Sequence, residues 1–140
     1  MSKPSALVDL DDTDLTVASI ADDVRGFSVM DSNGDDVGDV DGLLIDEDER
    51  RVRFLKVGSG GFLGIGKEKR LIPVDAITDI EGDRVKVNTT REHIAGSPDY
   101  DPDLVEQSTY PDYYGYYGVA PYWAPGYIYP PYPYGAAGRL

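Results

Sequence analysis

The middle of the chain alternates apolar and polar residues in short stretches separated by turn residues, a pattern that predicts β-strands. Residues 26–30 and 37–45 flank Asn33-Gly34. Asn-Gly between two apolar stretches is typical of a hairpin, because both residues tolerate positive φ. Along the second stretch, Asp39 and Asp41 alternate with apolar residues. We expect a first hairpin here, with these two acids facing water.

Four further strands are predicted before residue 89. They cover residues 51–57, 69–74, 77–80 and 84–88. The first is rich in β-branched and aromatic residues, but its mixed pattern indicates either burial on both faces or a bulge. In the last, Val85 and Val87 alternate with charged residues and are expected to point inward.

One short helix of about two turns is predicted after the last strand. Thr89 and Glu92 have the spacing of a capping box with Thr89 as the N-cap, and Gly96 and Pro98 end the helix. Six short strands joined by tight turns lack the crossover helices that a parallel sheet needs. The predicted fold is therefore all-β, a small antiparallel six-stranded barrel or curled sheet with one short helix.

Composition divides the 140 residues into three segments. Residues 109–140 hold ten of the 11 tyrosines, 6 of the 10 prolines and 5 of the 16 glycines. Residues 1–18 are acidic and carry few apolar residues, too few to repay the entropy of ordering the chain. We therefore predict an acidic flexible arm over residues 1–21, a folded domain over 22–103, and a disordered, low-complexity tail over 104–140.

Charge and residue content exclude several classes of function. The 26 acids and 13 bases give a formal net charge of −13, which would repel nucleic acids and anionic lipids. The absence of cysteine removes disulfides, thiolate nucleophiles and Cys-ligated zinc. No apolar run approaches the roughly 18 to 20 residues of a membrane span, and the acidic start is unlike a signal peptide. We expect a cytoplasmic protein.

A linked series of short motifs runs through the predicted domain. In order, these are Val24-Arg25-Gly26, Asn33-Gly34, Val37-Gly38-Asp39-Val40, Leu44-Ile45-Asp46, Arg51-Val52-Arg53-Phe54, Gly61-Phe62-Leu63-Gly64-Ile65-Gly66 and Leu71-Ile72-Pro73-Val74. Their order and spacing resemble the PRC-barrel family over about residues 22–103. The resemblance implies a six-stranded barrel that acts mainly as an adaptor or assembly module, without catalytic residues or a cofactor. Residues 90–102 are similar to the stand-alone bacterial members, often described as stress-associated.

Two members of this family have roles that we do not expect here. The ribosome maturation factor has an RNA-associated N-terminal domain, and the photosynthetic reaction-centre H subunit has a membrane helix before its barrel. Residues 1–21 are expected to supply neither.

Three motifs and His93 suggest a chemistry of their own. Residues 61–67 spell Gly-x-x-x-x-Gly-Lys, but Glu68 stands where a phosphate-binding loop needs Ser or Thr, so a Gly-rich loop between strands is predicted instead. The acidic turn 31–36 lacks the glycine and glutamate positions of an EF-hand, which predicts a hairpin turn with solvated acids. The acidic turn 46–49 is likewise predicted to be solvated. His93 lacks a second histidine or a cysteine to share a metal and is expected on the helix surface or packed at its edge.

The sequence favours a non-enzymatic module that forms a homo-oligomer, most simply a homodimer, or docks an unidentified protein partner, with the tail adding weak multivalent contacts. The interface candidates are Phe62, Leu63 and Ile65 in the Gly-rich loop and Tyr113, Tyr114, Tyr116, Tyr117, Trp123, Tyr127, Tyr129, Tyr132 and Tyr134 in the tail. The alternative is a small-ligand or divalent-cation-binding domain that uses the Gly-rich loop or the acidic turns. An enzyme is the third hypothesis, and no constellation of catalytic groups supports it.

Overall fold

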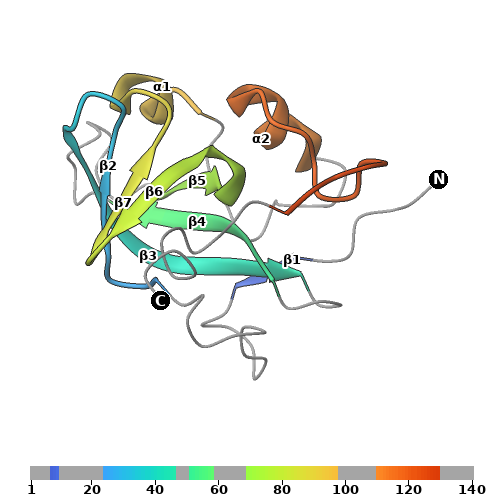
Figure 1. Ribbon diagram of the computed structural model, residues 1–140, viewed down its shortest axis with the longest axis horizontal. Coiled ribbons are helices and arrows are strands. Elements are labelled where there is room, and N and C mark those ends of the chain that lie inside the picture. The colour runs from blue at the N-terminus through green and yellow to red at the C-terminus, as the bar shows by residue number, and fades with distance from the viewer. Residues whose placement is uncertain (1–6, 10–23, 47–50, 59–68, 98–109, 130–140) are drawn as a thin grey trace.

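The computed structural model describes residues 7–9, 24–46, 51–58, 69–97 and 110–129 (Figure 1). Its strands are β1 (Leu7–Asp9), β2 (Ser28–Met30), β3 (Asp36–Asp46), β4 (Val52–Gly58), β5 (Lys69–Pro73), β6 (Ile77–Glu81) and β7 (Arg84–Val87). Its helices are the 3-10 turn η3 (Val74–Ala76), α1 (Arg91–Ala95) and α2 (Tyr110–Tyr117). All six predicted strands are therefore present, within a residue or two of the predicted ends.

The strands form one curled sheet in the order β5-β4-β3-β2-β7-β6, and β1 pairs with β3 beside this path. Two features differ from the predicted antiparallel barrel. First, β2 and β7 pair in parallel, which is possible because the long connection between them lets β7 arrive in the same direction as β2. Second, no ladder joins β5 to β6 among the described strands, because η3 separates them and turns the chain. The sheet is thus curled but not closed.

The first hairpin forms as predicted. Val29 pairs with Gly38 in an antiparallel ladder, and Gly34 takes a φ of 84° in the turn. Val85 and Val87 are buried, and Asp39 and Asp41 are exposed, which confirms the predicted faces.

Strand β4 is buried on both faces and contains a bulge at Arg53, so both interpretations of its mixed pattern are confirmed. One face contributes to the main core, which contains apolar residues from β2 to β7 and Ile94 of α1. The opposite face carries Phe54, which packs with Leu44 and Leu71 in a second cluster. The sheet therefore needs cover on two sides.

The short helix begins one residue later than predicted. Thr90, not Thr89, is the N-cap, and its side-chain oxygen accepts a hydrogen bond from the His93 amide. The Asp31 carboxylate accepts the Arg91 amide at 2.9 Å and so fixes the first helical residue. The helix has five residues rather than two full turns and ends at Gly96, as expected.

Parts of the predicted arm and tail form regular structure. Leu7–Asp9 pair with the last residues of β3, 44–46, whereas β2 pairs with its first residues, 36–39. The last part of β3 therefore has backbone groups that β2 does not reach and that β1 can pair with. Residues 110–117 form α2, where Pro111 occupies the first turn, a position that tolerates proline, and residue 118 has the positive φ typical of a helix end. Burial of its aromatic residues stabilises a segment of low helix propensity. The prediction of disorder is wrong for residues 110–129, and the rest of the arm and tail lies outside the described residues.

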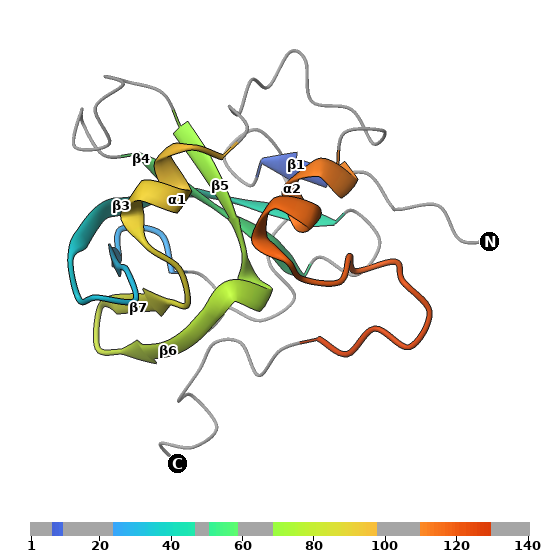
Figure 2. The same ribbon diagram turned by 90° about the horizontal axis from the view of Figure 1, so that it is seen from above.

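Figure 2 shows α1 and α2 near β5, where both helices contact this strand. The segment after α2 extends away from the helix and then returns toward the sheet (Figure 2).

Candidate docking surface

The second apolar face of the sheet is occupied by α2. Tyr113 and Tyr114 are 4% and 1% exposed and lie against Leu44, Phe54 and Leu71. The Phe54 ring centroid is 4.9 Å from that of Tyr114 and 5.9 Å from that of Tyr113, the latter in an edge-to-face arrangement. Such pairs add to the free energy of apolar burial. The helix is therefore attached by two aromatic anchors in an apolar sheet surface.

The segment after the helix continues this contact. Trp123 meets Tyr114 and Tyr122 edge-on, at centroid distances of 5.6 and 5.0 Å. Farther on, the Tyr127 hydroxyl donates to the Asp75 carboxylate at 2.7 Å, and the Tyr129 hydroxyl donates to the Val52 carbonyl at 3.0 Å. Residues 113–129 thus touch β3, β4, β5 and η3 at successive points.

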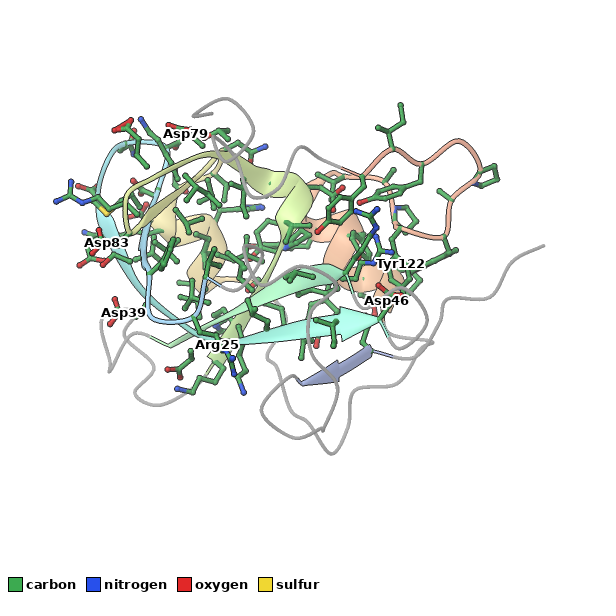
Figure 3. The ribbon with its side chains drawn as sticks, turned by 60° about the horizontal axis from the view of Figure 1, so that its bottom comes forward. Arg25, Asp39, Asp46, Asp79, Asp83 and Tyr122 are labelled. Atoms are coloured by element: carbon green, nitrogen blue, oxygen red, sulfur yellow. The ribbon has the colours of Figure 1, made fainter. Side chains whose placement is uncertain are left out.

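A buried ion pair anchors the same segment near the start of β4. The β-bulge opposite Ile45 leaves Arg53 as the extra residue of β4, and bulges commonly redirect a side chain in this way. Arg53 Nε donates to Asp46 at 2.8 Å, and both side chains are at least 96% buried. The Arg53 guanidinium lies 4.6 Å from the Tyr122 ring centroid and 5.4 Å from that of Tyr129. Figure 3 shows Asp46 and Tyr122 close together.

This pair corrects the prediction of a solvated acidic turn at residues 46–49 for Asp46 alone, and residues 47–49 lie outside the described residues. Asp46 is 1% exposed because Arg53 neutralises it and the aromatic segment covers both. Arg53 inside the apolar stretch 52–57 is the sequence signal of a buried base that needs a partner, but it does not identify Asp46 as that partner.

The two helices are joined by a stacked pair. The rings of His93 and Tyr116 are 4.1 Å apart and nearly parallel, and the Tyr116 hydroxyl donates to the His93 carbonyl at 2.7 Å. The Tyr116 carbonyl is 3.1 Å from His93 Nε2. His93 therefore packs at the edge of its helix, one of its two expected places.

The acidic turn after β2 is built around a buried carboxylate. Asp31 is fully buried and accepts backbone amides from Asn33, Asp35 and Arg91. Burial by itself raises the pKa of Asp31, but the three amide donors and the nearby Arg91 charge outweigh it and hold that pKa below its ordinary value. The hairpin prediction is confirmed, whereas the expectation that all acids of this turn are solvated is wrong for Asp31.

Three ionisable groups in and beneath the aromatic segment have raised pKa values. Burial raises the pKa of Asp75 despite the hydrogen bond from Tyr127, and burial also raises the pKa values of Tyr114 and Tyr127. The Tyr127 hydroxyl therefore stays protonated and donates its hydrogen bond to Asp75.

The predicted interface residues fall into three groups. Tyr113 and Tyr114 are buried against the chain's own sheet, which reasoning from composition did not anticipate. Five others are half-buried, namely Tyr116, Tyr117, Trp123, Tyr127 and Tyr129. Phe62, Leu63, Ile65, Tyr132 and Tyr134 lie outside the described residues. The structure adds Phe54, Arg53, Asp75 and Tyr122 to the surface, and Ile128 projects from it with 84% exposure.

Metal binding and membrane insertion gain no support from the described residues. Among them, no group of three or more His, Cys, Asp or Glu side chains is placed to hold a metal ion. Within the same ranges, no helix has both the length and the apolar character needed to cross a membrane.

Comparison with known proteins identifies the family. No curated protein matches the chain significantly. The family model of the PRC-barrel domain matches residues 17–94, which is 78 of the 140 residues. The match contains all the strands from β2 to β7, and this domain is a protein-interaction or assembly module that is generally non-catalytic. The resemblance in the sequence is thereby confirmed, and this chain belongs to the PRC-barrel domain family.

Proposed function

We propose that this chain is a non-enzymatic adaptor or assembly module. Its β-domain forms homo-oligomers or docks a protein partner, and its C-terminal aromatic segment takes part in these contacts. The observation that carries the proposal is the apolar face of β3, β4 and β5, which binds residues 110–129 of the same chain.

The manner of this binding supports a docking role. The segment contributes no strand to the sheet and attaches through aromatic anchors, a cation–π contact and hydrogen bonds from tyrosine hydroxyls. These are the contacts by which a separate helical peptide occupies an apolar groove. A partner that carries aromatic residues at similar spacing can make the same contacts. We infer that this face is a docking surface for such a segment, supplied here by the chain itself.

The first test is the light-scattering mass after size exclusion of residues 1–140 and 1–108 over a range of concentrations, with far-UV circular dichroism as a check of folding. Truncation uncovers Leu44, Phe54 and Leu71, so the 1–108 chain is expected to associate more strongly than the full chain. An excess of a synthetic 110–129 peptide should reverse this association. Leu71→Asp in the 1–108 chain is the matched control and should prevent it.

Two results would count against the docking surface. If the folded 1–108 chain has the same mass as the full chain and does not bind the peptide, the covered face is ordinary core. If the light-scattering mass increases with concentration only for the full chain, the tail itself mediates self-association. Ile128 and the predicted Tyr132 and Tyr134 then become its candidate contacts.

The alternative of a divalent-cation site gains no support from the described acidic turn, because Asp31 already accepts three backbone amides. The Gly-rich loop lies outside the described residues, so a ligand role for it remains a prediction. The cytoplasmic location, the stress association and the domain boundaries at 22 and 103 also remain predictions.

A further inference from the structure

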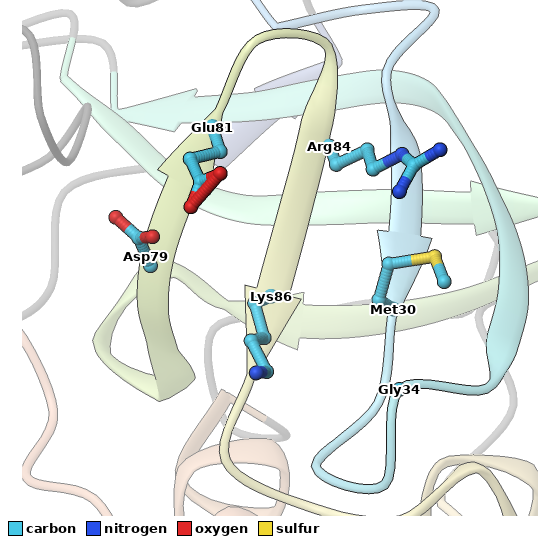
Figure 4. Close-up of a pocket in the computed structure, with 6 residues that line it drawn as sticks. All are labelled: Met30, Gly34, Asp79, Glu81, Arg84 and Lys86. Carbon is cyan, nitrogen blue, oxygen red and sulfur yellow. The ribbon is translucent and has the colours of Figure 1, made fainter.

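A second surface lies on the outward side of β2, β6 and β7, away from the aromatic segment. It contains a shallow pocket of about 240 Å³, shown in Figure 4. The pocket is lined by Met30, Gly34, Asp79, Glu81, Arg84 and Lys86. Asp79 and Met30 are half-buried, and the other charged side chains are exposed.

The charges on this surface are sorted by strand. Asp79 and Glu81 lie two residues apart on β6, and Arg84 and Lys86 lie two residues apart on β7, so each pair lies on one face of its strand. In the ladder, Asp79 is opposite Lys86 and Glu81 is opposite Arg84. One column of acids therefore runs beside one column of bases.

These four side chains form no ion pair with any described residue. In Figure 4 the Arg84 side chain extends away from Glu81 and lies over β2. The four charges sum to zero, in a chain whose formal net charge is −13. The charges that line the pocket therefore cancel, and they add no net repulsion when two copies of the chain approach each other.

We propose that this face pairs with the same face of a second copy of the chain. A two-fold axis that runs parallel to the strands, above the space between β6 and β7, places β6 of one copy over β7 of the other. Because the rotation preserves height along the strands, Asp79 of each copy then faces Lys86 of the other, and Glu81 faces Arg84. All four ion pairs form at once, as an isologous interface requires.

The pairing rests on the proposed assembly function and assigns a surface and a partner to it. Three short strands offer less area than the roughly 800 Å² per partner of a standard interface. The expected dimer is therefore weak and forms at high protein concentration. Its specificity comes from charge, since a copy displaced by one strand brings like charges together.

The test uses sedimentation equilibrium of the full chain and two charge-reversed proteins. The first carries Arg84→Glu and Lys86→Glu, and the second carries Asp79→Lys and Glu81→Lys. Each alone presents one sign of charge and should lose about tenfold or more in association constant, equivalent to about 1.4 kcal/mol. An equimolar mixture of the two should recover association to within about threefold of the natural chain, because an acidic face then meets a basic one.

Glu92→Lys with Asp41→Lys is the matched control, because it changes the net charge by the same amount as the second protein at two exposed positions outside both this face and the aromatic segment. It should associate like the natural chain. The single variants Arg84→Glu and Glu81→Lys, alone and mixed, repeat the test if half-buried Asp79 proves necessary for folding.

Recovery in the mixture supports the interface, since no effect on the stability of either chain can produce it. Association that is unchanged in the reversed proteins, or a mixture that fails to recover, overturns this interface and leaves the assembly function in place. A full chain that stays monomeric up to millimolar concentration also overturns the interface. The docking surface beneath the aromatic segment is tested separately, by the association of the 1–108 chain and its reversal by the 110–129 peptide.

Discussion

Replacing Phe54 with alanine should detach the aromatic segment before the β-domain unfolds. Phe54 is fully buried, and it is the ring against which both Tyr113 and Tyr114 pack. A buried Phe→Ala change costs about 3 to 5 kcal/mol. Part of this cost falls on the contacts of Phe54 within the sheet, with Leu44 and Leu71. We expect about 2 to 3 kcal/mol to fall on docking, which lowers the docking equilibrium about 30- to 150-fold.

Trp123 supplies the assay, because it is the only tryptophan and is half-buried against Tyr114 and Tyr122. In Phe54→Ala, its emission should shift to longer wavelength and its quenching by acrylamide should increase in native buffer. Far-UV circular dichroism should still report a folded β-domain. In a urea titration, the fluorescence transition should precede the transition seen by circular dichroism.

Leu55→Ala is the matched control. Leu55 is the next residue of β4, is equally buried and belongs to the main core on the opposite face. It should lower the free energy of unfolding by about 2 to 5 kcal/mol while the Trp123 emission stays native below the transition. If both variants instead show coincident transitions and native emission in buffer, the segment and the sheet are one cooperative unit, and the segment is not a docked ligand of the sheet.

Three other substitutions test contacts elsewhere in the fold. Asp31→Asn removes the charge that three backbone amides stabilise, and urea titration at pH 7 should show a loss of about 1 to 2 kcal/mol. Because the pKa of Asp31 is lowered in the folded state, its contribution to stability is present above the unfolded-state pKa and is lost as the pH falls through the folded-state pKa. A stability difference between the natural chain and Asp31→Asn that persists unchanged in acid would contradict this reasoning. Gly96→Ala places a Cβ 2.9 Å from the Tyr116 hydroxyl oxygen and should destabilise the chain by about 1 to 2 kcal/mol in thermal melts. Adding Tyr116→Phe removes that oxygen and should recover most of the loss. A loss that Tyr116→Phe leaves unchanged would have another origin. Tyr127→Phe removes the hydrogen-bond donor to Asp75, and burial already raises the pKa of that carboxyl group. The substitution should lower the free energy of unfolding by about 1 kcal/mol at pH 8, and this loss should shrink as the pH falls and Asp75 is protonated. A loss that grows in acid would disprove the contact.

Some parts of the candidate docking surface were accessible to sequence reasoning and others were not. The aromatic composition of residues 109–140 identified the segment as unusual, because composition is visible without a fold. Its place in the structure was not visible, because Pro and Gly content argues against a helix when only local propensity is considered. Tyr113 and Tyr114 repay the cost of ordering that helix by burial against Phe54, a contact between positions about 60 residues apart.

The strands, the first hairpin and the short helix follow from the order of residues alone, because turn residues and the alternation of apolar positions act over a few residues. The same local signals carried the resemblance to the PRC-barrel family. Tertiary structure decided the parallel pairing of β2 with β7, the open edge between β5 and β6, and the burial of Asp31 and Asp46. Each of these depends on which distant groups meet. An acid such as Asp46 is indistinguishable from a solvated one until the fold brings Arg53 and the aromatic segment against it.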